Sequence, residues 1–441
     1  MRRSCLVLVL AAACGGSGDD GGGGDAAIDA PGTSGDGGSG GARCAPVPPA
    51  SGATMTVASA SALAAAIESA TPGLTIEVAA GTYDVRGVRL WIDTPGVTLR
   101  GATGDRGDVR LEAGHVPFLG GVINVAADDV TIAHLTIVEG RFHAIHVFGT
   151  DSPTERTRIH DVHVIDPGEQ AIKINSNPMD ADGGEVSCSH LELTRGGAGF
   201  VTQQVSSGSR CYTGGIDAHR ARGWTVRDNH IEGFWCAGSG GEYLSEHGIH
   251  FWRGSRDTLV ERNLLVNNAR AIGLGLDSQG RTYADTPCPG VTMAGHYGGV
   301  IRANAIVGND ATLFASGNGM DTGIALWSAC GATVIHNSIG TTGAPFTGIE
   351  WRFAETSVTV VNNLVTARIL ARDGNPTSIE AGNLASAAPS LFADVGGGDL
   401  HLAPGASAAI DQGATGYEAV TGLDLDGETR TSAPDVGADE R

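Results

Sequence analysis

One pattern of four residues recurs along this chain: a small residue, then Ile, then any residue, then an apolar residue. Its Ile residues follow one another at intervals of 27, 44, 33, 23, 52 and 25 positions. The short intervals define a repeat of about 25 residues, and the long ones indicate insertions. A repeat this short can bury its apolar segment only against neighbouring repeats, which predicts a solenoid. The copies are Ala144–Val147, Ala171–Ile174, Gly215–Ala218, Gly248–Phe251, Ala271–Leu274, Gly323–Leu326 and Gly348–Trp351.

A second pattern, Val or Ile, two residues, Asn, one residue and an apolar residue, lies upstream in each later repeat. The spacing of three and then two breaks strand alternation at the Asn, which predicts a bend there. Asn tolerates the left-handed backbone that a bend requires. Stacked bends would place Asn over Asn as a ladder of amides. The Asn residues are Asn229, Asn263, Asn304, Asn337 and Asn363, and earlier repeats have Leu135, Val162 and Leu191 at this position.

Over about residues 55–441, these short β-branched strands and bends resemble the right-handed parallel β-helix, or pectate-lyase-like, superfamily. The resemblance implies an all-β fold, a single right-handed parallel β-helix with coils of about 25 residues. In such folds a short helix caps the open end, and residues 61–69 fit it, with Leu63, Ala66, Ile67 and Ala70 on one face. Asp424–Gly427 resembles a calcium loop without its remaining ligands, so we expect a structural turn there.

The first residues are typical of an exported protein. Two Arg residues precede the apolar stretch 5–13, which is too short to span a bilayer and predicts a signal peptide over residues 1–14. Ala-Ala-Cys resembles a bacterial lipoprotein cleavage site, with Cys14 acylated and anchored in a membrane, although Leu stands one place early. We expect an outer-membrane or cell-surface lipoprotein, with plain secretion as the alternative. Residues 15–43 predict a disordered Gly- and Asp-rich linker, and residues 44–441 the β-helix domain.

Six further cysteines, an even number in an exported chain, predict disulfides. Their positions beside the insertions favour Cys211–Cys236 and Cys288–Cys330, and Cys44 and Cys188 are the others. The cysteine spacing matches no zinc motif, so we predict no metal ligands.

The chain has 28 Lys and Arg residues, and only Lys173 is a lysine. A lysine amine can become neutral and basic, whereas Arg stays charged. Alternation within the repeat directs Ile172 inward and Lys173 outward. The same position in neighbouring coils holds titratable residues, which gives an outward column of His146, Lys173, Asp217 and His250. A second column beside it contains Phe148, Asn175, His219 and Trp252.

Insertions at 194–213 and 233–246 flank the coils that carry Asp217 and His250, and we expect them to wall a cleft over the columns. The superfamily's lyases remove a proton next to a uronate carboxylate and then expel the glycosidic oxygen. Resemblance to them implies that Lys173 is the base and that His250 or His219 is the acid. Arg253 or His146 would neutralise the carboxylate with help from Asn175, and Trp252 and Trp327 would face sugar rings. Some relatives use Ca²⁺, but paired acidic ligands for it are not evident here.

Three alternatives stay open. Inverting hydrolysis needs two carboxylates about 6.5–9.5 Å apart; Asp217 offers one, Glu350 lies several coils away, and Glu169 or Glu246 would have to supply the other. A uronate C5-epimerase shares the proton abstraction. A non-catalytic carbohydrate-binding or adhesive solenoid would use the same polar and aromatic groups. The net charge of −21 argues against nucleic acid as a partner, and we expect a monomer that binds a polysaccharide, acidic in the lyase reading.

Overall fold

The computed structural model describes residues 43–117, 120–176, 178–202 and 208–441. The predicted signal peptide with Cys14, and all of the predicted linker except Arg43, lie outside the described residues. None of the described helices has the length and apolar character needed to cross a membrane.

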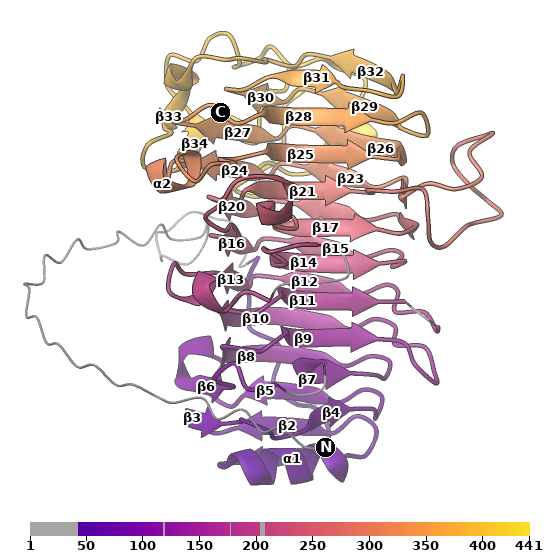
Figure 1. The fold of residues 1–441 in the computed structure, drawn as a ribbon, viewed down its shortest axis with the longest axis vertical. Coiled ribbons are helices and arrows are strands. Elements are labelled where there is room, and N and C mark those ends of the chain that lie inside the picture. The colour runs from indigo at the N-terminus through magenta and orange to yellow at the C-terminus, as the bar shows by residue number, and fades with distance from the viewer. Residues whose placement is uncertain (1–42, 118–119, 177, 203–207) are drawn as a thin grey trace, which may run out of the picture.

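The chain winds into a stack of coils, each of which adds parallel strands to those of the coil before it (Figure 1). One side of the stack is a ten-stranded parallel sheet, which is formed by the small-Ile-x-apolar repeats and by coils at each end. Its strands, in order, are β4 (Leu90–Ile92), β7 (Gly121–Val125), β9 (His143–Phe148), β11 (Gln170–Asn175), β14 (Gly214–His219), β17 (Ile249–Trp252), β21 (Arg270–Leu274), β25 (Thr322–Trp327), β28 (Thr347–Arg352) and β31 (Ile369–Ala371).

The remaining sides belong to a bent sheet of 22 strands. β8 and β10 pass through the bend, and their first and second halves pair with different strands. Its strands are β1 (Thr54–Val57), β2 (Thr75–Val78), β3 (Gly81–Asp84), β5 (Thr98–Gly101), β6 (Val109–Glu112), β8 (Thr131–Val138), β10 (Arg158–Ile165), β12 (Glu185–Ser187), β13 (His190–Glu192), β15 (Thr225–Arg227), β16 (His230–Glu232), β18 (Ser255–Arg256), β19 (Leu259–Glu261), β20 (Leu264–Val266), β22 (His296–Tyr297), β23 (Val300–Arg302), β24 (Ala305–Gly308), β26 (Ala329–Ile335), β27 (Ser338–Thr341), β29 (Ser357–Val361), β30 (Leu364–Val365) and β32 (Thr377–Ala381).

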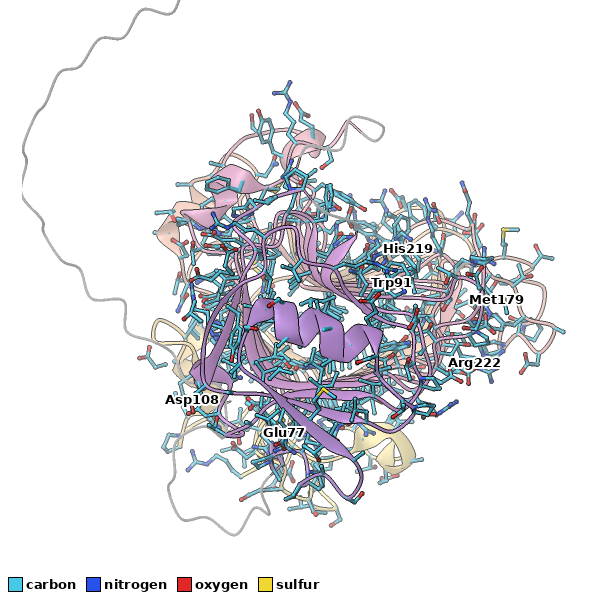
Figure 2. The ribbon with its side chains drawn as sticks, turned by 90° about the horizontal axis from the view of Figure 1, so that it is seen from below. Glu77, Trp91, Asp108, Met179, His219 and Arg222 are labelled. Carbon is cyan, nitrogen blue, oxygen red and sulfur yellow. A yellow bond between two sulfur atoms is a disulfide. The ribbon has the colours of Figure 1, made fainter. Side chains whose placement is uncertain are left out.

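Helix α1 (Ala60–Glu68) lies across the first coil and closes that end of the solenoid (Figures 1 and 2). The Ser59 side chain caps it by accepting a hydrogen bond from the Ala62 amide at 3.1 Å. Leu63, Ala66 and Ile67 are buried against the interior, as the sequence predicts. The other elements are the short helices α2 (Ala311–Phe314) and α3 (Glu418–Thr421), the 3-10 turns η1 (Arg106–Asp108), η2 (Gly197–Phe200), η3 (Gly241–Tyr243) and η4 (Pro389–Leu391), and the hairpin β33 (Phe392–Asp394) with β34 (Asp399–Leu402).

The predicted asparagine ladder is present inside the bend. Each Nδ2 donates to Oδ1 of the Asn one coil further on, at 2.9–3.0 Å, and that Oδ1 also accepts a backbone N–H. The left-handed residue, however, is the one before each Asn, with φ of 51–62°. The Asn side chain therefore stabilises the bend from the inside rather than adopting the left-handed backbone itself. The ladder residues are Asn229, Asn263, Asn304, Asn337, Asn363 and Asn383.

One assignment in this pattern is wrong. Leu191 pairs with Ile231 and belongs to the apolar position, whereas Ser189 occupies the Asn position and donates its backbone N–H to Asn229 Oδ1 at 2.9 Å. The Ser189 hydroxyl donates to the Ser187 carbonyl within the same turn and accepts the Val162 backbone N–H from the preceding coil, so Ser189 stands at the start of the ladder.

Both predicted disulfides, Cys211–Cys236 and Cys288–Cys330, are confirmed, and Cys44–Cys188 is a third. Three disulfides are typical of exported proteins. The C-terminal segment packs Phe392, Leu400 and Val436 over outward apolar residues of the bent sheet, among them Leu264 and Val266. Asp424 and Gly427 form the expected structural turn, in which Asp424 accepts the Glu428 amide at 2.6 Å.

Candidate functional site

The outward column has the predicted register. In the ten-stranded sheet Lys173 pairs with His146 on one side and Asp217 on the other, and Asp217 pairs with His250. The second column follows, with Asn175 between Phe148 and His219, and Trp252 next. The first column, which contains His146 and Lys173, extends through Asn124 to Trp91. Trp91 lies on the same side of the solenoid as His219 (Figure 2).

Lys173 is the centre of a buried polar cluster. Its ammonium contacts Asp217 Oδ2 and donates to Nε2 of His219 at 3.1 Å. A lysine ammonium has only donors, so Nε2 of His219 is the acceptor and the imidazole is neutral. Burial, which outweighs the attraction of Asp217, lowers the pKa of His219. Lys173 is 5% exposed and Asp217 is 1% exposed.

Asp217 is ionised in this cluster. Burial alone would raise its pKa, but the charge of Lys173 and the neighbouring His219 hold the pKa well below its ordinary value. Its second oxygen accepts a hydrogen bond from Nε1 of Trp252 at 2.7 Å. Both oxygens are therefore occupied, which makes Asp217 a partner of Lys173 rather than a free base.

His146 cannot supply positive charge at neutral pH. Burial, together with the charges of Lys173 and His219, lowers its pKa to about 3. Its Nε2 accepts a hydrogen bond from Asn175 Nδ2 at 3.0 Å, as a neutral imidazole does. This corrects the expectation that His146 neutralises a carboxylate.

His250 is fully buried. Its Nε2 donates to the Gly275 carbonyl at 3.0 Å, and its Nδ1 lies 3.2 Å from a carboxylate oxygen of Glu246. With both ring nitrogens occupied, His250 has no free nitrogen for a substrate. His219 is the more accessible histidine, because its side chain is 18% exposed.

An open groove of about 370 Å³ runs beside the second column. Its lining is formed by Asn175, His219, Arg220, Arg253, Gln279 and Gly280. Among the described residues, no carboxylate forms an ion pair with either arginine; Arg253 lies over the Trp252 ring at 4.7 Å. The groove is therefore a cationic channel that reaches the edge of the Lys173 cluster.

Sequence reasoning missed Arg220 because alternation fails where it lies. Arg220 and Arg253 directly follow β14 and β17 and are in the left-handed conformation, with φ of 61° and 57°. A left-handed residue leaves the strand alternation, so the side chains cannot be assigned to a column. The matching signal was available, since an Arg follows the second-column residue in both coils.

The two insertions meet beside the column. Cys211–Cys236 joins them, and Glu246 donates its backbone N–H to the Thr213 carbonyl at 2.9 Å. Burial, and then the negative charges of Asp217, Glu246 and Glu169, raise the pKa of the Tyr212 hydroxyl. Lys173, Asp217 and His250 are buried in this column, so the accessible surface beside them is the groove and not a cleft over Lys173.

Trp252 and Trp327 are expected to offer ring faces to sugars, but neither exposes a free ring face. Trp327 is 4% exposed, and its Nε1 donates to Glu350 at 2.8 Å. The Trp252 ring stacks on His250 at 5.3 Å, with Arg253 over it. Both rings serve packing in this conformation.

The remaining carboxylates have separate environments. Glu350 is fully buried and bonded to Trp327, Thr347 and Arg372, which leaves it unavailable for hydrolysis. Burial raises the pKa of Glu169 to about 7, so it is protonated part of the time at neutral pH. Glu169 lies 3.7 Å from His143 in the turn before β11.

Calcium does not fit this cluster. It takes six to eight oxygen ligands, whereas the described carboxylates here are tied to Lys173, Trp252 and His250. Glu246, His247 and His250 each bring one possible ligand atom within 4.8 Å of the others, but both ring nitrogens of His250 are already bonded, which disfavours an ion there. Both nitrogens of buried His247 lack a partner in the described region. Gly273 makes room for that ring, since a Cβ there would lie 2.7 Å from it.

No protein-family model matches the chain, and no curated protein matches it. Among solved structures, pectate lyase Pel9A is similar with a TM-score of 0.50 and 13% identity, over 86% of this chain and 90% of that one. An alginate lyase from Paenibacillus sp. str. FPU-7 gives 0.49 and 15%, over 74% and 97%. Polygalacturonase from Erwinia carotovora ssp. carotovora gives 0.41 and 12%, over 76% and 96%.

Identities this low bear on the fold alone. The stacked parallel strands, the bend ladder, the capping helix and the likeness to Pel9A agree with one another. The chain is a right-handed parallel β-helix protein.

Proposed function

We propose that this protein is a lyase of uronate polysaccharides, with Lys173 as the base and His219 as the acid. The observation that carries the proposal is the contact between these two residues beside a cationic groove. The structural neighbour Pel9A, a pectate lyase by name, has the same fold and agrees with this substrate class. Disulfide bonds agree with work outside the cell.

The resting cluster holds one ammonium, one carboxylate and one neutral imidazole. Transfer of a proton from Lys173 to Nε2 of His219 creates a neutral amine and an imidazolium in one step. Asp217 Oδ2 lies 3.4 Å from His219 Nε2 and stabilises the imidazolium. Ordinary lysine and histidine pKa values differ by about 4 units, or roughly 5 kcal/mol, and this is a lower bound on the cost because burial lowers the pKa of His219. That cost fits within the barrier of about 14–17 kcal/mol that usual turnover numbers imply.

The amine then removes the proton on the carbon next to the uronate carboxylate, and the C–H electron pair forms the new double bond. The glycosidic C–O bond breaks, and the leaving oxygen takes the proton from His219. Lys173 is again an ammonium and His219 is again neutral, so the cycle closes with no net proton change. Arg253 and Arg220 would hold the carboxylate, with Asn175 assisting.

A hydrolase is the second candidate, because the raised pKa of Glu169 suits a general acid. Asp217 would have to be its partner, and its hydrogen bonds disfavour that role. A C5-epimerase would share the first proton transfer, and a binding module would use only the groove.

The test is incubation of the purified chain with a panel of uronate polymers while the absorbance of the unsaturated product is followed. The proposal expects that absorbance to rise on at least one polymer. New reducing ends without absorbance would favour the hydrolase. Exchange of solvent deuterium into the intact polymer would favour the epimerase, and binding without reaction would favour the adhesive module.

A further inference from the structure

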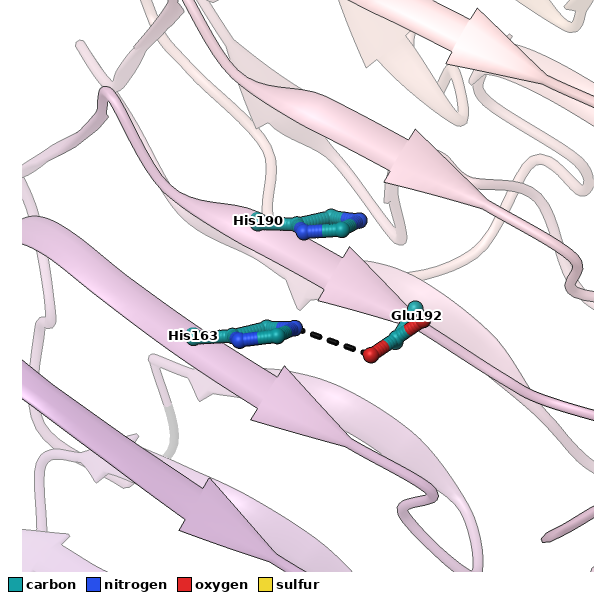
Figure 3. Close-up of side chains that lie close together, drawn as sticks. All are labelled: His163, His190 and Glu192. Carbon is teal, nitrogen blue, oxygen red and sulfur yellow. Dashed lines mark hydrogen bonds and ion pairs between the residues drawn. The ribbon is translucent and has the colours of Figure 1, made fainter. Parts of the chain in front are cut away.

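Three histidines stack on the outer face of the bent sheet, away from the Lys173 cluster. His163 of β10 pairs with His190 of β13, and His190 pairs with His230 of β16. Successive ring centroids are 4.5 Å apart, and the rings are within 5° of parallel. Figure 3 shows the first two rings one above the other, with Glu192 beside them. We call these three residues the histidine ladder.

Carboxylates accompany the ladder, each shifted by one coil. Nε2 of His163 bonds to Glu192 at 2.9 Å, and Nε2 of His190 bonds to Glu232 at 2.8 Å. The corresponding residue for His230 is Val266, which pairs with Glu232 in the next coil. His230 therefore has no carboxylate at the position that Glu192 and Glu232 occupy for the other two histidines. Its Nε2 has no hydrogen-bond partner in the described part of the chain, although His230 is only 4% exposed.

We propose that this ladder binds one divalent transition-metal ion, with Zn²⁺ the best match, through Nε2 of His190, Nε2 of His230 and the Glu232 carboxylate. Two imidazoles and a carboxylate form a donor set that zinc accepts, with water as the fourth ligand. The three ligand atoms lie within 4.8 Å of one another.

The other possible triad, His163, His190 and Glu192, also uses His190. Two divalent ions that shared one imidazole would repel each other at close range, so we expect the ladder to hold a single ion. Binding between His163 and His190 would break the bond of His163 to Glu192 and leave His230 unpaired. Binding between His190 and His230 gives the buried nitrogen of His230 the partner that it lacks, which favours this triad.

The geometry needs only local adjustment. Zinc bonds of 2.0–2.1 Å place tetrahedral ligand atoms about 3.3 Å apart. Oε1 of Glu232 lies 2.8 Å from Nε2 of His190, and Oε2 of the same carboxylate lies 3.7 Å from Nε2 of His230, so these two distances fall on either side of that spacing. The parallel rings must turn their edges towards each other, and histidine χ2 is broad enough to allow this. The His190 and Glu232 side chains are 19% and 32% exposed, so an ion can reach them.

The ligands are also in suitable protonation states. Burial lowers the pKa of His230 to about 4, so its imidazole is neutral at pH 7. Burial would raise the pKa of Glu232, but the hydrogen bond from His190 and the nearby imidazoles hold it below its ordinary value. Metal binding then displaces only the hydrogen that His190 shares with Glu232.

The experiment is calorimetric titration of the full chain, without a histidine tag, with ZnCl₂ at pH 7.5. We expect one ion per chain. His230→Asn and Glu232→Gln should each weaken binding at least about 10-fold. The matched control His163→Asn, and His247→Asn in the separate Glu246 cluster, should stay within about 2-fold.

Absence of one-to-one binding, or retention of affinity in His230→Asn, would overturn the proposal. Equal losses in His163→Asn and His230→Asn would overturn the choice of triad. Thermal unfolding of each variant without metal separates loss of the site from loss of the fold. Cobalt titration of the unchanged chain gives a second measurement, because tetrahedral Co²⁺ at this site should show intense visible bands, and purely octahedral bands would contradict the site.

Discussion

Nζ of Lys173 lies 3.1 Å from Nε2 of His219, and the carboxylate of Asp217 contacts both groups. The three side chains come from two neighbouring strands, β11 and β14, through the register that pairs Lys173 with Asp217 and Asn175 with His219. A proton on Lys173 can therefore reach His219 without moving either backbone.

Lys173→Arg should strongly reduce lyase activity while leaving polymer binding largely intact. Arg keeps the positive charge that Asp217 needs, but it does not release a proton at working pH. We expect turnover to fall by about 10²–10⁴-fold, the usual contribution of a general base. Initial rates of unsaturated product on the preferred polymer measure this. Unchanged turnover in a folded Lys173→Arg variant would exclude Lys173 as the base.

His219→Gln should separate proton transfer from binding. Gln retains a hydrogen-bond acceptor for Lys173 but cannot carry a proton. We expect kcat to fall by about 10²-fold or more, with KM nearly unchanged and the pH dependence of kcat altered. His250→Gln, measured in parallel, should cost far less if its buried contacts are structural. A greater loss in His250→Gln, with normal thermal unfolding, would assign the acid to His250 instead.

Arg220→Gln and Arg253→Gln should weaken binding of acidic polymers and not of neutral ones. Both residues line the groove, and neither has a carboxylate partner among the described residues. We expect KM to rise about 3- to 10-fold for each, and the salt dependence of KM to decrease. Equal KM values with and without the arginines would place the substrate elsewhere. Arg222→Gln is a suitable control, because Arg222 lies 3.7 Å from Asp257 and is not part of the groove lining.

The register of the Lys173 column was predictable from sequence because each coil repeats its inward Ile. Once Ile145, Ile172, Ile216 and Ile249 are aligned, alternation fixes which residues point outward. The histidine ladder was not found in this way. Its members have no conspicuous motif, and they meet only through a register in which Ser189 takes the place of Asn.

Burial was the second quantity that sequence could not supply. Trp327 and His250 lie on the outward face in the alignment, yet neighbouring chain covers both. Whether an outward residue is accessible depends on the path of the insertions, and their sequences do not follow the repeat. Arg220 lines the groove because the backbone is left-handed directly after β14, and this conformation cannot be recognised from the residue type.

Asn304→Ala should destabilise the solenoid strongly. The amide of Asn304 donates to Val260 O, Arg302 O and Asn337 Oδ1, and its own Oδ1 accepts from Asn263. Truncation leaves several buried groups unpaired, each at about 1–3 kcal/mol, so we expect about 3 kcal/mol or more in the free energy of unfolding. Asn383→Ala, at the half-buried end of the ladder, should cost about 1 kcal/mol. Urea unfolding with equal midpoints for the two variants would contradict a buried network.

Acidification from pH 7 to pH 5 should destabilise the fold through its buried neutral histidines. Burial lowers the pKa of His296 and of His336 to about 3. Below about pH 6.5 the unfolded chain binds protons at these positions and the native chain does not, so the free energy of unfolding falls as the pH falls from about 6.5 towards 3. Each histidine contributes about 2 kcal/mol between pH 6.5 and 5, at about 1.4 kcal/mol per unit.

Glu169 acts in the opposite direction over part of this range, because its pKa of about 7 means that the native chain holds a proton that the unfolded chain releases above about pH 4.5. The stabilisation from Glu169 roughly equals the loss from one histidine, so the net loss in the free energy of unfolding depends on the other buried histidines. His296→Gln isolates the effect, since His296 is fully buried and hydrogen-bonded to Thr258 at 2.9 Å. The difference in urea-unfolding free energy between pH 7 and pH 5 should shrink by about 2 kcal/mol in this variant. An unchanged difference would mean that His296 takes up its proton in the native chain, and the buried imidazole would then not be a source of acid lability.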